Sequence, residues 1–212
     1  MERKPQITIA APVCAEFTEK KSRFIGQLFP AENEDEAKAM LADVRNRNKG
    51  ARHNVYAWII GEQDQFTRSS DDGEPAGTGG KPVLESLKKA NLHNVVLIVT
   101  RYFGGVLLGA GGLTRAYARA AQMAIDQSQK ICRIPAKKIV ISIDYTFLTK
   151  AESILNSLQV QIRDKIFSDK VCIICAASLD IIPQLAAKLQ EASNGSYHLE
   201  QLAESAYLEQ YL

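Results

Sequence analysis

The sequence predicts an α+β protein built from two domains. At 212 residues, the chain is longer than a typical single domain. Its 46% of hydrophobic and 24% of charged residues lie in the ordinary range of globular proteins, so we expect a folded chain. Runs typical of strands and of helices alternate along the sequence, and their order differs between its first and second parts.

The chain opens with two runs typical of β-strands, residues 6–13 and 22–29, which predict a hairpin. Residues 32–48 are predicted to form a helix, because acidic residues occupy the first turn and basic residues stand near the end. Apolar residues between these ends recur at helical spacing. Gly50 marks the end of this helix.

A buried sheet is predicted for the middle of the chain. Residues 54–60 (NVYAWII) and 94–100 (NVVLIVT) are apolar runs typical of central strands. Between them, we expect a long loop at residues 61–80 and a short helix at residues 82–90. A strongly helical run follows at residues 113–127.

A domain boundary is predicted at residues 128–138, where Pro135 lies among four basic residues. We therefore expect one domain at residues 1–133 and a second at residues 134–212. The second has the βαββαβ order of the ferredoxin-like fold. Its expected elements are strands at residues 139–145, 160–167, 171–177 and 196–202, and helices at residues 149–158 and 181–192.

Composition limits the class of function. The formal net charge of +2 divides into +4 over residues 1–133 and −2 over residues 134–212, a weak indication that the first domain binds an anionic partner. No apolar stretch suits a membrane helix or a signal peptide, so we expect a cytoplasmic protein without membrane contact. The cysteines are too scattered for a disulfide framework, which fits a reducing compartment. They are Cys14, Cys132, Cys172 and Cys175.

The first of two glycine-rich segments is SDDGEPAGTGGKP, residues 70–82. Glycine backbone can approach a phosphate closely, and the predicted helix that follows has an N-terminus that attracts anions. The segment is not a Walker A loop, because Pro75 and Pro82 occupy places where that motif needs other residues. Its candidate binding residues are Asp71, Asp72, Gly73, Glu74, Gly77, Thr78, Gly79, Gly80 and Lys81.

Three carboxylates in this segment, Asp71, Asp72 and Glu74, are ligands of the kind that hard divalent cations prefer. Adjacent acids with glycine and proline are also typical of a solvated turn. We favour the turn, so the sequence predicts neither a metal nor a cofactor.

The second glycine-rich segment is RYFGGVLLGAGGLTRAY, residues 101–117, and it also runs into a predicted helix. Thr114 stands where a dinucleotide-binding loop needs its third glycine, which argues against that motif. Arg115 and Arg119 are four residues apart and share one face of the predicted helix. Cations beside an aromatic ring are suited to bind a nucleic-acid strand. A plain solvated basic face explains them equally well. The candidate residues are Arg101, Tyr102, Gly104, Gly105, Gly111, Gly112, Arg115, Tyr117 and Arg119.

No catalytic set is predicted. The three histidines lie far apart in the sequence, and no serine stands in a nucleophile-elbow pattern. Cys172 and Cys175 have CxxC spacing, but they lie in a predicted strand, where residues three apart face opposite sides. We interpret both as buried core thiols.

The two glycine-rich segments, with KSRFIG at residues 21–26 and ARHNVYAW at residues 51–58, resemble the IMPACT family in its bacterial, YigZ-like group. The resemblance covers the first domain, and the C-terminal unit resembles the second domain of bacterial members. It implies a first domain like the second domain of ribosomal protein S5, a sheet with helices on one face. The resemblance also implies that the second domain is similar in fold to domain V of elongation factor G.

The resemblance also implies RNA or ribosome binding. Our leading hypothesis is a non-catalytic protein that binds RNA, ribosomes or a translation factor and regulates translation. In this hypothesis Tyr102 or Tyr117 stacks on a base, while phosphates are neutralised by Lys81, Arg101, Arg115 and Arg119. The alternative is an enzyme acting on a small phosphorylated or nucleotide substrate, with a carboxylate of residues 71–74 as base or metal ligand. The oligomeric state stays open.

Overall fold

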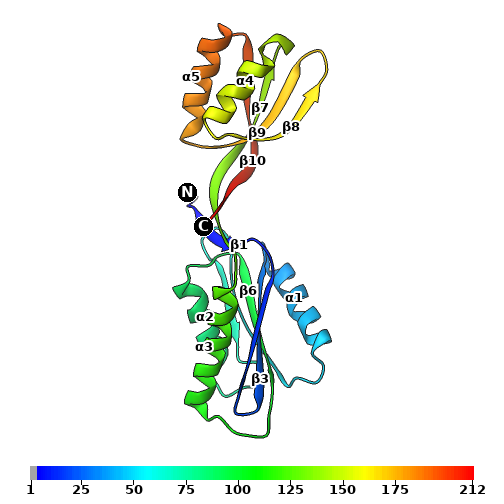
Figure 1. The fold of residues 1–212 in the computed structure, drawn as a ribbon, viewed down its shortest axis with the longest axis vertical. Helices are drawn as coiled ribbons and strands as arrows, with labels where there is room; N and C mark the ends of the chain where they lie inside the picture. The colour runs from blue at the N-terminus through cyan, green and yellow to red at the C-terminus, as the bar shows by residue number, and fades with distance from the viewer. Residues whose placement is uncertain (1–3) are drawn as a thin grey trace. The chain divides into compact units, whose positions relative to one another are not determined.

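The protein was analysed as a computed structural model, which describes residues 4–212 except for the side chains of residues 203–206. The chain forms two compact units (Figure 1). The N-terminal unit consists of residues 6–131 with the last two residues, and the C-terminal unit is built from residues 132–210. Each combines a sheet with helices, which confirms the predicted two-domain α+β class.

The N-terminal unit has a five-stranded sheet in the order β2-β3-β6-β4-β5, in which all neighbouring strands are antiparallel. Its strands are β2 (Val13–Glu19), β3 (Ser22–Pro30), β4 (His53–Ile60), β5 (Phe66–Ser70) and β6 (Val95–Tyr102). The central strands β4 and β6 are apolar on both faces, so both faces of the sheet need a cover.

Helices α2 (Gly80–Lys89) and α3 (Ala110–Asp126) cover one face of this sheet, and α1 (Glu34–Arg47) covers the other (Figure 1). The expectation of helices on one face only is therefore wrong. A second helical cover is needed because the face of β4 and β6 that carries Trp58 and Ile98 is apolar, and α1 buries it. On the opposite face, small residues let α3 approach closely: a Cβ at Gly26 would lie 2.4 Å from the carbonyl oxygen of Ala120.

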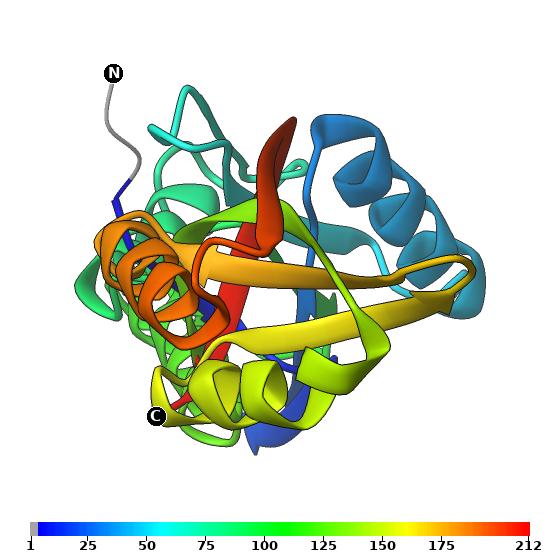
Figure 2. The same ribbon diagram turned by 90° about the horizontal axis from the view of Figure 1, so that it is seen from above.

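The C-terminal unit has the predicted βαββαβ arrangement. Its strands belong to a five-stranded sheet of order β1-β7-β9-β8, where β1 is Gln6–Ile9, and β10 also pairs with β7. Figure 2 shows the hairpin of β8 and β9 with α4 and α5 beside it. A short 3-10 turn, η1 (Tyr145–Phe147), precedes α4. The elements are β7 (Lys130–Ile143), α4 (Leu148–Ser157), β8 (Gln161–Phe167), β9 (Val171–Ser178), α5 (Ile181–Ser193) and β10 (Tyr197–Tyr211).

Three details differ from the sequence predictions. The first strand, β1 (Gln6–Ile9), ends before Pro12, which has no N–H for a ladder, and β2 is the strand that pairs with β3. Strand β5 lies within the predicted long loop. The predicted boundary segment is part of the continuous strand β7.

The two cysteines of the CxxC run have different environments. Cys175 is buried in the core of the C-terminal unit, where burial raises the pKa of its thiol to about 12. Cys172 is half-buried on the other side of the strand, with its Sγ 3.4 Å from Oγ of Ser142. The interpretation as a core thiol therefore holds for Cys175 and is wrong for Cys172.

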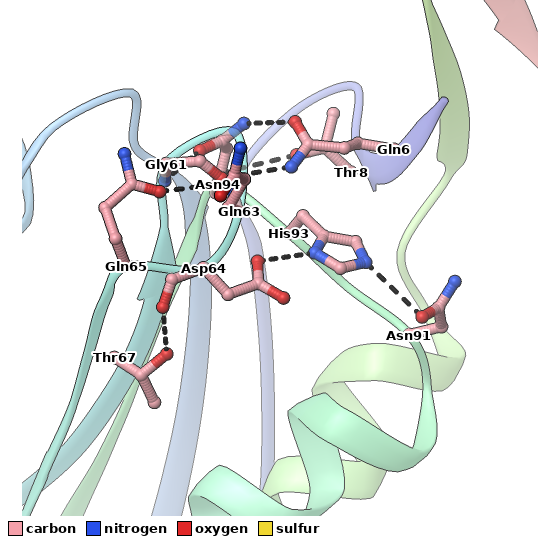
Figure 3. Close-up of polar contacts among 10 residues, drawn as sticks. All are labelled: Gln6, Thr8, Gly61, Gln63, Asp64, Gln65, Thr67, Asn91, His93 and Asn94. Atoms are coloured by element: carbon pink, nitrogen blue, oxygen red, sulfur yellow. Dashed lines mark hydrogen bonds and ion pairs between the residues drawn. The ribbon is translucent and has the colours of Figure 1, made fainter. Parts of the chain in front are cut away.

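A polar network holds β1 against the turn that leads from β4 to β5 (Figure 3). The buried amide of Asn94 donates to Gln6 Oε1 at 3.1 Å and accepts from the N–H of Gly61 at 2.8 Å. Nearby, Nδ1 of His93 lies 2.7 Å from Oδ1 of Asp64. Because each group bridges two segments of one unit, we assign this network to the fold.

The described residues include no helix with both the length and the apolar character needed to cross a bilayer.

Candidate functional site

A buried ion pair joins the two glycine-rich segments. Arg101 Nη1 donates to Glu74 Oε1 at 2.7 Å, and the hydroxyl of Tyr117 donates to the same oxygen at 2.7 Å. Arg101 is 5% exposed and Glu74 9%. The guanidinium also lies 5.5 Å from the ring centroid of Phe24 and 5.4 Å from that of Phe103. Since a buried charge requires a partner, this network fixes how the two segments meet.

The network changes the roles expected for Tyr117 and Arg101. Tyr117 is fully buried, so its predicted role in stacking on a base is wrong. Burial first, and then the hydrogen bond to Glu74, raises the pKa of Tyr117 far above its usual value, so its hydroxyl remains a donor. Nη1 of Arg101 is paired with Glu74 and the residue is buried, which argues against its predicted role of neutralising a phosphate.

The N-terminus of α2 is occupied by a carboxylate of the protein itself. Asp71 accepts hydrogen bonds from the N–H groups of Gly77, Gly79 and Gly80 at 2.9, 2.8 and 2.8 Å. Burial alone would raise the pKa of Asp71, but these three donors outweigh it and lower the pKa. The anion site predicted at this helix start is therefore filled by Asp71.

Asp72 has partners of its own. It pairs with Arg45 Nη2 at 2.5 Å and accepts from the backbone N–H of Asn54 at 2.6 Å. Its backbone carbonyl lies 2.9 Å from Nδ1 of His53. With Asp71 and Glu74 also engaged, the three carboxylates do not converge, and within the described part of the chain no three metal-ligating side chains gather at one point.

The start of α3 is different, because no side chain caps it. Its N-cap residue, Gly109, has φ +72°, and no side-chain hydrogen bond closes the first turn. Gly111 and Gly112 lie within that turn, and Gly111 is exposed. The free N–H groups of a helix start carry partial positive charge, so this end of α3 attracts anions.

Beside this helix start lies a hollow of about 290 Å³, which we call the cationic hollow. Arg115 and Arg119 of α3 line it with Lys20 from the turn between β2 and β3. The guanidinium of Arg119 lies 4.4 Å from the ring centroid of Phe17, and its Nη1 is 3.8 Å from a carboxylate oxygen of Glu19. Sequence reasoning missed Lys20 and Phe17, because only the packing of α3 on β2 brings them to this helix.

A second hollow, of about 400 Å³, lies against the loop that connects β6 to α3, and we call it the apolar hollow. Phe103 and Leu107 are large apolar residues of this loop with exposed fractions of 46% and 82%. Leu108 lines both hollows. The other residues that line the apolar hollow are Arg52, His53, Glu74, Pro75, Arg101, Gly109, Ala110 and Leu113.

The remaining predicted residues have mixed roles. Lys81 is exposed and lines a third hollow with Gly77 and Thr114. Tyr102 is half-buried and donates to Asn48 Oδ1 at 2.9 Å, and the hydroxyl of Thr78 donates to the Pro75 carbonyl at 2.7 Å. Gly73 and Gly105 have positive φ, and Gly104 packs against the backbone of Lys21.

Comparison with known proteins places both glycine-rich segments inside a known domain. Residues 20–125 match the Impact N-terminal domain, and residues 141–196 match a domain of unknown function, DUF1949. The IMPACT family member YigZ of Escherichia coli is 36% identical over 192 residues, which is 90% of this chain and 94% of YigZ. The chain belongs to the IMPACT family. The resemblance predicted from the sequence is thus confirmed.

Other IMPACT proteins match to different extents. The family member YvyE of Bacillus subtilis is 40% identical over 152 residues, 72% of this chain and 70% of YvyE. Protein IMPACT of Rattus norvegicus is 37% identical over 113 residues, 51% of this chain and 34% of the rat protein. A crystal structure described as that of a hypothetical protein has a TM-score of 0.64 and 34% identity, and covers 96% of this chain and 100% of its own.

Proposed function

We propose that this IMPACT family protein binds RNA, free or within the ribosome, without catalysing a reaction, and regulates translation through that contact. The observation that carries the proposal is the cationic hollow at the uncapped start of α3. There, Lys20, Arg115 and Arg119 surround an opening next to free backbone N–H groups. We further propose that this contact takes place in the cytoplasm.

Phosphates suit this hollow because it combines two kinds of positive charge. Arginine and lysine side chains release counterions when they bind a nucleic-acid backbone, and a helix N-terminus adds backbone donors. Arg119 is held over Phe17 and near Glu19, so it is partly oriented before any ligand arrives. Arg115 and Lys20, which line the same hollow, are exposed.

The competing enzyme hypothesis has less support from the geometry. It required a carboxylate of residues 71–74 that is free to act as a base or a metal ligand. Asp71, Asp72 and Glu74 instead each stabilise the loop through separate partners. A low pKa also makes Asp71 a weak base.

The direct test reverses the charge of the cationic hollow. We expect the double variant Arg115→Glu, Arg119→Glu to bind a fluorescent single-stranded RNA and isolated ribosomes at least about tenfold more weakly at low salt. The control, Lys38→Glu with Arg47→Glu, makes the same change in charge on exposed positions of α1, which covers the other face of the sheet. Equal binding by the two double variants, or no binding by the unaltered protein, would sink the proposal.

A further inference from the structure

The apolar hollow has features that the contacts within the protein do not explain. Leu107 is 82% exposed and Phe103 46%, although both are large apolar side chains in a loop of the most glycine-rich part of the chain. Exposed apolar residues around an opening indicate a binding surface. Neither residue belongs to the core clusters of the N-terminal unit.

The polar groups of this hollow offer both donors and acceptors. His53 Nδ1 lies 2.9 Å from the Asp72 carbonyl, which can only accept, so Nδ1 carries the hydrogen and Nε2 of the neutral ring is an acceptor. Arg101 lines the hollow, is 5% exposed, and its Nε has no hydrogen-bond partner among the described residues. A buried donor of this kind calls for a polar partner.

The charge around the opening favours a ligand with an anionic group. Gly109 and Ala110, at the start of α3 that no side chain caps, line the hollow, and exposed Arg52 adds a cation. Glu74 is already neutralised by Arg101. The hollow therefore presents a flat aromatic surface, polar groups and positive charge side by side.

We propose that the apolar hollow receives one unstacked base of single-stranded RNA, an inference that rests on the proposed function. The base packs on Phe103 and Leu107, and its polar edge faces His53 and Arg101. Single-stranded RNA is commonly recognised through bases that stack on aromatic side chains in this way.

The two hollows are placed to hold one strand. They share Leu108, and the first turn of α3 lines both, through Gly112 on one side and Ala110 on the other. A strand whose phosphates contact Lys20 and Arg115 therefore passes the helix start where the next base can turn into the apolar hollow.

The test compares a labelled single-stranded oligoribonucleotide with the same backbone carrying abasic sites, by fluorescence anisotropy. We expect the base-containing strand to bind about tenfold more tightly. Phe103→Ala and Leu107→Ser should each reduce this preference to less than about threefold. Val106→Ser should keep it, because Val106 is an exposed residue of the same loop that lines neither hollow.

The outcomes separate this inference from the proposed function. Equal affinity for both strands, with both lost in Arg115→Glu, Arg119→Glu, would overturn the base pocket and leave RNA binding standing. A preference that survives Phe103→Ala and Leu107→Ser, or that Val106→Ser abolishes as well, would place the base elsewhere. No binding of either strand would overturn both proposals.

Discussion

Glu74 is the residue on which the junction of the two glycine-rich segments depends. One of its oxygens accepts from both Arg101 and Tyr117 at a buried position. Removing one member of a buried ion pair leaves a charge without its partner, which costs more than the pair contributes in net terms. The pair is therefore a sensitive probe of the geometry.

We expect Glu74→Gln to lower the free energy of unfolding by about 3 kcal/mol, because it leaves the Arg101 charge buried and unpaired. Urea unfolding, followed by the fluorescence of the single tryptophan, Trp58, measures this in the N-terminal unit. The control Glu85→Gln lies exposed on α2 and should change stability by less than about 0.5 kcal/mol. Equal effects of the two changes would contradict the buried pair.

Asp71 gives the loop a dependence on pH. Its pKa is lower in the folded protein than in the unfolded chain, so the ionised form stabilises the fold. This contribution is complete above the unfolded pKa of about 4 and is lost as the pH falls through the lower, folded pKa.

At pH 7, Asp71→Asn should therefore unfold more easily than the unaltered protein, by about 1 kcal/mol, and the difference should shrink below about pH 4. Urea titrations at several pH values check this. Asp43→Asn removes an exposed carboxylate that pairs only with Arg47 on α1, and serves as the control. A difference that stays constant down to pH 2 would mean that the carboxylate of Asp71 does not cap α2.

Residue identities alone pointed to two segments that meet in the fold, but not to the burial of Arg101 and Tyr117. The sequence placed Arg101 and Tyr117 among the candidates because a cation and an aromatic side chain stood near glycines. Their burial depends on the pairing of β6 with β3 and on the packing of α3, which bring Glu74 between them. No local pattern in the sequence predicts the contact of Glu74 with Arg101 and Tyr117.

At the scale of elements, the helices of the two glycine-rich segments begin in different ways. The start of α2 is closed, since Asp71 caps it and Gly80 packs on backbone: a Cβ there would lie 2.7 Å from the nitrogen of Ser70. The start of α3 is open, and a Cβ at Gly111 would meet only Arg115 Nη1, at 3.7 Å. Glycine is thus needed for packing at the first site and not at the second.

These contacts predict opposite effects of the same substitution. Gly80→Ala should destabilise the N-terminal unit by about 1–3 kcal/mol, because the added methyl group overlaps the backbone of β5. Gly111→Ala should be neutral or stabilising by up to about 1 kcal/mol, since alanine favours a helix. Thermal unfolding of both variants is the measurement. Equal destabilisation would show that the two helix starts are packed alike.

Sequence reasoning missed β2, β5 and the start of β7 as strands. Strand β5 (FTRSS) is mostly exposed and is ordered by its ladder with β4. The start of β7 is basic and contains Pro135, and the sequence predicted a domain boundary there rather than a strand. The buried strands β3, β4 and β6 and all five α-helices were predicted within a few residues, because hydrophobic burial dictates their patterns.

At the scale of the whole molecule, the two units keep separate cores and the described residues of the site all lie in the N-terminal unit. This agrees with the charge division along the chain, in which the first domain carries the excess of cations. The C-terminal unit has the ferredoxin-like order of strands that the sequence predicted. Membership of the IMPACT family extends across both units through YigZ.

The central claim is that the cations beside the open start of α3 bind the phosphates of RNA. The most direct measurement is the dependence of single-stranded RNA affinity on salt, for the unaltered protein and for Arg115→Gln with Arg119→Gln. We predict a steep fall of affinity with salt. The slope of log K against log salt should be shallower by about 1.4 in the variant, because two phosphates are no longer neutralised by arginine. An identical slope in both proteins would contradict the claim.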